Sequence, residues 1–149
     1  MLYTPHFLVG AAILKLVPNP VIGLPLALLS HFALDMTPHN DFDIKPGASL
    51  KSIFSQKNKQ GNFFIAVMSL DIFLLIVSFF WILFTKNNYW LIIGGGVGIS
   101  PDALEQSLLI LGKQIPGLQY NFQWRVSKKY GFISYPVVCG VAFWILNRV

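Results

Sequence analysis

The sequence predicts an all-α fold, a polytopic helical bundle in a membrane. Hydrophobic residues make up 54% of the 149 residues and charged residues only 11%, less than half of the roughly 25% usual in soluble proteins. The run at 62–84 holds about twenty apolar residues, which match a hydrocarbon core of roughly 30 Å. A chain of this length suits one domain. We therefore expect a single integral-membrane domain over residues 1–149.

The first forty residues predict a helical hairpin. Two apolar stretches, 7–17 and 21–36, are separated by Pro18-Asn19-Pro20, which no straight helix accommodates in its interior. At about 1.5 Å per residue the first arm is too short to cross a membrane. We expect that arm to be re-entrant or shielded by its neighbours.

Three later segments predict membrane helices. Residues 62–84 are the clearest of them, and residues 130–147, about eighteen, suffice to cross with little tilt. Between them, residues 89–112 are interrupted by Gly94-Gly95-Gly96-Val97-Gly98 and by Pro101. We expect this fourth helix of the chain to be broken or locally unwound near its middle.

The loops predict an orientation. If the last three helices each cross once, the stretches 38–61 and 113–129 share one face. That face is the cytoplasmic one by the positive-inside rule, because its basic residues outnumber the three on the other face, Lys15, Lys86 and Arg148. The basic residues of the cytoplasmic face are Lys45, Lys51, Lys57, Lys59, Lys113, Arg125, Lys128 and Lys129.

The net charge of +5 does not indicate a nucleic-acid partner, because the basic residues form no basic helix interleaved with polar ones. With one cysteine, Cys139, the chain has no intrachain disulfide and no zinc-finger spacing.

One segment, SHFALDMTPHNDFD at 30–43, holds two of the three histidines and half of the six acids. His31, Asp35 and His39 are spaced at i, i+4 and i+8, so the first two share a helix face, and His39 joins them if the chain curls back after the helix. His6 begins the first arm on the same side. Asp102 lies at a similar depth. We expect these five residues to form one polar site in the cytoplasmic half of the membrane.

Two interpretations of this site remain open. An unpaired charge in a bilayer is costly, and a divalent cation would offset that cost. Imidazole with carboxylate suits zinc, which we favour, and also manganese or iron. Alternatively, the cluster is a hydrogen-bonded polar core that pins the hairpin to the fourth helix.

Three further patterns accompany the cluster. Asp71 is expected to orient a histidine, to bind the metal directly, or to be a buried paired acid. Glu105, one turn from Asp102, is either a general base or a partner on the helix face. Asp41 and Asp43 either hold a second cation or lie in a solvated loop.

The pairs Ser100-Pro101 and Thr4-Pro5 predict helix starts. Each offers an N-cap followed by a proline at the first helical position. A metal ligand, Asp102 or His6, would then lie in the first turn.

Short motifs add a family resemblance. The N-terminal TPH with His6, the PNP turn, SHFALDMTPHND and GISPDALE resemble the bacterial inner-membrane metal-dependent hydrolases of the LexA-regulated type. The resemblance implies a membrane-embedded site of His and Asp, a hydrolytic activity and a bacterial inner-membrane location.

Two functions are therefore expected. The first is a metal-dependent hydrolase that cleaves an ester or phosphoester, such as an anionic lipid, at the cytoplasmic membrane face. The alternative is a non-enzymatic membrane protein, an ion or proton carrier or a scaffold, that contains a buried His/Asp cluster. A homodimer would compensate for the small size of a carrier.

Overall fold

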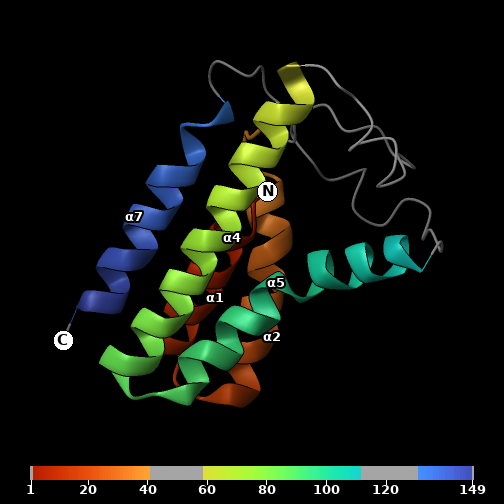
Figure 1. Ribbon diagram of the computed structural model, residues 1–149. Coiled ribbons are helices and arrows are strands. Elements are labelled where there is room, and N and C mark those ends of the chain that lie inside the picture. Colours follow the sequence, from red (N-terminus) through yellow and green to blue (C-terminus); the bar gives the residue numbers. More distant parts are fainter. Residues whose placement is uncertain (1, 41–58, 112–130, 149) are drawn as a thin grey trace.

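The computed structural model describes residues 2–40, 59–111 and 131–148 and, within them, five helices and no strand (Figure 1). The all-α expectation is confirmed. The helices are α1 (Tyr3–Leu16), α2 (Pro20–Asp35), α4 (Lys59–Lys86), α5 (Tyr89–Ile110) and α7 (Ser134–Asn147). Of the basic loop residues that predict the orientation, all but Lys59 lie outside the described residues, so the orientation stays a prediction.

The turn between α1 and α2 lies where the sequence predicts it. α1 ends at Leu16 and α2 begins at Pro20. The Asn19 side chain accepts a hydrogen bond from the Val21 N–H at 3.0 Å, which satisfies one of the open donors of the first turn. Proline at the first helical position lacks only an N–H that would have had no helical partner.

α1 lies at the centre of the bundle and packs against the four other helices of the described chain (Figure 1). Ala11 and Leu14 are buried on it, and they share one core with Ile82 of α4 and Leu146 of α7. Because α1 is surrounded, its side chains are removed from solvent and lipid along most of its length.

Glycines bring the backbones of α1 and α5 into contact. A Cβ added at Gly10 would lie 2.3 Å from the Gly94 carbonyl oxygen, and one at Gly98 would lie 2.5 Å from the His6 carbonyl oxygen. No side chain fits in either place. This close approach sets His6 directly against the middle of α5.

α5 is one continuous helix from Tyr89 to Ile110, so the predicted break is wrong. The helix instead bends sharply near Pro101 (Figure 1). Proline has no N–H for the carbonyl of Val97, four residues earlier. The Ser100 hydroxyl donates to that carbonyl at 2.8 Å, so Ser100 supports the bend and does not start a new helix.

The predicted helix start at Thr4-Pro5 is also displaced. α1 begins at Tyr3, and its N-cap is Leu2, whose side chain makes no capping hydrogen bond. Thr4 therefore lies inside the helix, and another part of the chain must satisfy the open N–H groups of its first turn.

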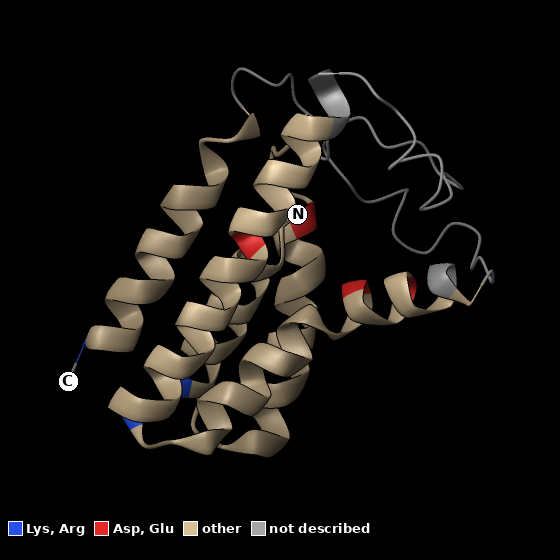
Figure 2. Cartoon of the chain, in the orientation of Figure 1, with Lys and Arg blue, Asp and Glu red and all other residues tan. Residues whose placement is uncertain are grey.

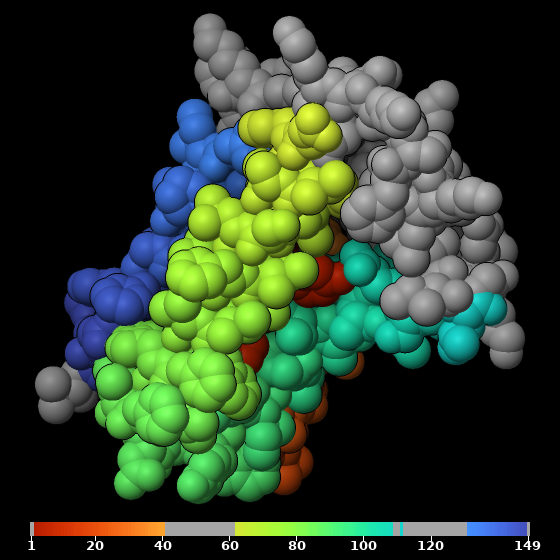
Figure 3. Space-filling model, in the orientation of Figure 1, coloured from red at the N-terminus to blue at the C-terminus, as the bar shows by residue number. Residues whose placement is uncertain are grey.

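One helix of the described residues is long and apolar enough to cross a membrane, over Asn62–Lys86 of α4. α2 and α7 are apolar but shorter, and α7 begins at Ser134, later than the predicted 130. Large apolar side chains such as Phe73 and Phe84 are exposed on α4, which covers much of the face seen in Figure 3.

Candidate metal centre

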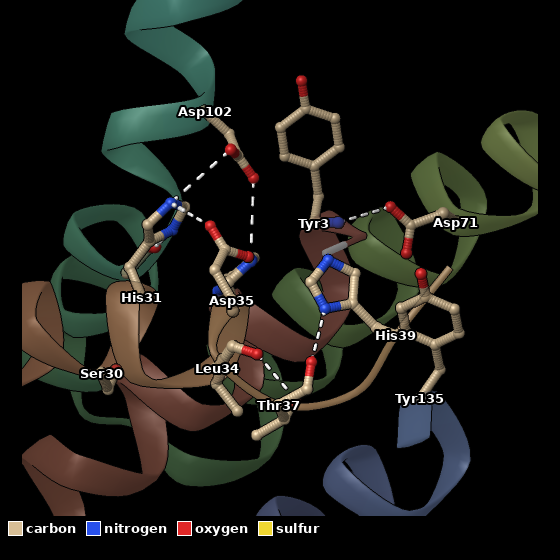
Figure 4. Close-up of polar contacts among 12 residues, drawn as sticks. Tyr3, Ser30, His31, Leu34, Asp35, Thr37, His39, Asp71, Asp102 and Tyr135 are labelled. Atoms are coloured by element: carbon tan, nitrogen blue, oxygen red, sulfur yellow. Dashed lines mark hydrogen bonds and ion pairs between the residues drawn. The ribbon is translucent and has the colours of Figure 1, made fainter. Parts of the chain in front are cut away.

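Four titratable side chains from three helices meet in one group, which we call the His/Asp cluster: His6 from α1, His31 and Asp35 from α2, and Asp102 from α5. The His6 Nε2 atom lies 3.3 Å from Asp35 Oδ1 and 3.8 Å from Asp102 Oδ2. His31 Nε2 lies 3.4 Å from Asp35 Oδ2 and 3.6 Å from Asp102 Oδ1. Figure 4 shows the Asp35 and Asp102 carboxylates turned toward the His31 ring. Each carboxylate therefore faces both histidines, one oxygen to each.

The histidines of the cluster are fully buried yet incompletely hydrogen-bonded. His6 and His31 are 0% exposed. Both ring nitrogens of His6 and Nε2 of His31 make no hydrogen bond of acceptable geometry within the described structure. A buried polar atom without a hydrogen bond costs about 1–3 kcal/mol. The Nε2 atoms of both histidines face the two carboxylates, in a group that could hold a metal ion.

A backbone hydrogen bond fixes the orientation of the His31 ring. Its Nδ1 lies 2.9 Å from the Gly98 carbonyl oxygen, and a carbonyl can only accept. Nδ1 must therefore carry the proton, and in the neutral ring Nε2 presents its lone pair to the carboxylates. A carbonyl that holds the second nitrogen is the usual support of a metal-binding histidine. Gly98 lies just before the bend of α5.

The spacing of the cluster fits a metal ion. A tetrahedral ion with ligand distances of about 2.0–2.2 Å sets its ligand atoms about 3.3–3.6 Å apart. The four nitrogen to oxygen separations, 3.3 to 3.8 Å, are of similar size, but each joins a histidine to a different carboxylate oxygen, so they are not the edges of one tetrahedron. Ligand atoms of His6, His31 and Asp102 all lie within 4.8 Å of one another. These three residues could hold a metal ion, and Asp35 adds a second carboxylate beside them.

Asp71 does not share the contacts that join the cluster. Its Oδ2 accepts the Tyr3 N–H at 2.8 Å and its Oδ1 accepts the Thr4 N–H at 3.1 Å. The Thr4 hydroxyl donates to the Asp71 carbonyl oxygen at 2.9 Å. This buried carboxylate of α4 is thus the missing N-cap of α1. Of the roles expected for Asp71, these contacts match that of a buried acid paired with backbone groups, which here belong to the turn that contains His6.

His39 also lies apart from the contacts of the cluster. It follows α2, is 0% exposed, and its Nδ1 lies 2.7 Å from the Thr37 carbonyl oxygen. In Figure 4 its ring is on the Asp71 and Tyr135 side of the group. Its role as a metal ligand stays a prediction that the observed contacts do not support.

The remaining predicted acids are less informative. Glu105 is exposed on α5, one turn beyond Asp102, so its role as a general base stays a prediction. Asp41 and Asp43 lie outside the described residues.

Two features of the site were missed from the sequence. Figure 4 shows the Tyr3 ring beside Asp102, at the start of α1. Its spacing of three residues from His6, which sets both on one helix face, was an available signal. The carbonyl oxygen of Gly98 carries no sequence signal, because every residue has such a group.

Comparisons with protein-family models, with curated proteins and with solved structures found no match to this chain. The fold and the site therefore define its class by themselves: over the described residues the chain is helical, with one helix long and apolar enough to span a membrane and a buried His/Asp cluster that could hold a metal ion.

Proposed function

We propose that the chain is a membrane-embedded metal-dependent hydrolase that acts on an ester or phosphoester, with zinc as the favoured metal and manganese or iron as the alternatives. The observation that carries the proposal is the pair of buried histidines with unbonded nitrogens, each facing two carboxylates. A bound divalent ion supplies Lewis acidity and lowers the pKa of a water molecule to near 7. His6, His31, Asp35 and Asp102 would hold it.

The exposure of the cluster gives the side of approach. The side chains of His6 and His31 are 0% exposed and that of Asp35 is 3% exposed, whereas that of Asp102 is 16% exposed. A substrate would therefore reach the cluster past Asp102, where α5 bends. Glu105 and the phenol of Tyr3 lie on this side, and either could move a proton to or from a substrate there.

The membrane location rests on the apolar surface. α4 has the length and composition of a spanning helix, and exposed large hydrophobics continue on α2 and α7, among them Leu29, Val137 and Phe143. We propose that the chain crosses the bacterial inner membrane several times and that its cluster is on the cytoplasmic side. An anionic lipid is then the substrate class nearest to the cluster.

A hydrolysis assay before and after metal removal tests this proposal. The protein purified in mild detergent would be stripped with chelator, reloaded with zinc, manganese or iron, and assayed on p-nitrophenyl esters, p-nitrophenyl phosphodiesters and phosphatidylglycerol. We expect activity on one of these classes, lost on stripping and restored by one metal. His31→Asn should lower it by about 100-fold or more, since even residues that only support a ligand cost 10–100-fold.

The matched control is His39→Asn, which changes an equally buried histidine outside the cluster contacts. It should keep the metal-dependent activity. Activity that persists without metal, or that survives His31→Asn, contradicts the proposal.

The second candidate is a non-enzymatic carrier or scaffold. It is favoured by the way the cluster joins α1, α2 and α5 through polar contacts, as polar residues do between membrane helices. In this case the folded protein hydrolyses none of the substrates, with or without added metal. Proton or metal flux into proteoliposomes then separates a carrier from a scaffold.

A further inference from the structure

A second polar site lies away from the His/Asp cluster, at the other end of the bundle. Lys15 is nine residues after His6 on α1, which is roughly 14 Å along a helix. Near it is a pocket of about 240 Å³. Six residues line it, from α1, the α1–α2 turn, the end of α4 and the start of α5: Leu14, Lys15, Pro18, Lys86, Asn88 and Leu91.

Two lysines share this pocket without a carboxylate partner in the described part of the chain. Lys15 Nζ donates to the Leu146 carbonyl oxygen at 3.5 Å, and Lys86 Nζ donates to Asn147 Oδ1 at 2.9 Å. Lys86 Nζ also lies over the Trp81 ring, 5.0 Å from its centre. Each ammonium group has three donors, so these contacts leave at least one open on each lysine. Figure 2 shows the acids of the described residues (red) lying away from the end of the bundle where the basic residues (blue) lie.

The position of each lysine, taken alone, is explained by the helix end at which it lies. Lys15 is in the last turn of α1 and Lys86 ends α4, and the C-terminal end of a helix attracts a cation. This attraction does not explain why two lysines line one cavity, since like charges that are close together repel each other. An anion between them would remove the repulsion and use the open donors.

In the membrane location proposed above, the pocket would lie at the level where phosphate groups occur in a bilayer. The apolar span of α4, Asn62–Lys86, ends at Lys86, and a spanning helix ends among the head groups. The volume is below the roughly 300–1,000 Å³ of sites for drug-sized ligands, so it suits a small anionic group.

We propose that this pocket binds a phosphate group, with Lys15 and Lys86 as its two cationic contacts. The phosphate belongs either to the head group of an anionic phospholipid or to inorganic phosphate. The site is independent of the proposed hydrolase activity, because no member of the His/Asp cluster lines it.

Native mass spectrometry with defined lipids tests the proposal. The detergent-purified protein would be offered palmitoyl-oleoyl-phosphatidylglycerol or the matching phosphatidylcholine, and inorganic phosphate binding would be measured separately by calorimetry. We expect a preference for phosphatidylglycerol or saturable phosphate binding. Lys15→Gln and Lys86→Gln should each weaken it by about fivefold, since a basic residue near a membrane surface contributes about that factor.

Two controls keep the test decisive. Arg148→Gln removes one positive charge near the C-terminus, where the guanidinium stacks 3.4 Å from the Trp144 ring centre and does not line the pocket. It should leave binding unchanged, and Lys15→Arg should retain it. Preference for the lipid alone assigns the site to a head group, and binding of phosphate alone assigns it to the free ion.

Equal binding of both lipids with no phosphate binding overturns the proposal. The proposal is also overturned if Arg148→Gln weakens binding as much as substitution of either pocket lysine does, because the effect would then come from overall charge.

Discussion

Removal of the Asp71 carboxylate should destabilise the protein more than removal of any exposed acid. The group is buried at 3% exposure and accepts the N–H groups of Tyr3 and Thr4 at 2.8 and 3.1 Å. A hydrogen bond to a charged acceptor contributes about 1.5–3 kcal/mol, so Asp71→Ala should cost about 3–6 kcal/mol in the free energy of unfolding. Asp71→Asn keeps one acceptor oxygen and should lose about half of that.

The assay is unfolding by sodium dodecyl sulfate in mixed micelles, followed by circular dichroism. Glu105→Gln is the matched control, because this acid is exposed on α5 and surface changes usually remain within about 0.5 kcal/mol. An Asp71→Ala protein as stable as the wild type would refute the assignment of Asp71 as the cap of α1.

Substitution of Asp71 should also affect metal binding by the His/Asp cluster. His6 follows Thr4 by two residues, in the turn that the Asp71 contacts hold in place. Residues that support a metal ligand without touching the metal typically change its affinity by about 10–100-fold. We expect Asp71→Asn to weaken metal binding within that range.

Two further predictions use the same unfolding measurement. Gly10→Ala should cost about 1–3 kcal/mol or more from overpacking, because its Cβ would lie 2.3 Å from an α5 carbonyl oxygen; Gly96→Ala, with nothing within 4 Å, should instead stabilise the helix by about 0.5–1 kcal/mol. Equal effects of the two would contradict the proposed contact. Tyr135→Phe should cost about 1 kcal/mol, since its hydroxyl donates to the Asn40 carbonyl oxygen at 2.6 Å; no change would show that this bond contributes nothing.

The sequence predicts the helices of this chain better than it predicts their interruptions. The hairpin turn depends on prolines, whose effect is local. The glycines of α5 indicate a break when read locally. In the folded protein Gly94 and Gly98 instead lie against the backbone of α1, a contact between residues far apart in the sequence, and α5 continues through them.

In the candidate site, too, the sequence predicts what depends on local spacing and does not predict what depends on long-range contacts. His31 and Asp35 face one way because both lie on α2 at helical spacing. α2 ends at Asp35, so the i+8 spacing of His39 has no geometric meaning there. Asp71 was placed in the site by its depth in the predicted membrane. Depth does not say which way a side chain points, and this one points to the start of α1.

The metal content of the purified protein tests the central claim most directly. Mass spectrometry of the detergent-solubilised wild type should find about one zinc, manganese or iron ion per chain. His31→Ala should lose it while His39→Ala retains it, with both variants folded by circular dichroism. A folded wild type without metal, or equal metal in His31→Ala, would contradict the assignment of the His/Asp cluster as a metal centre.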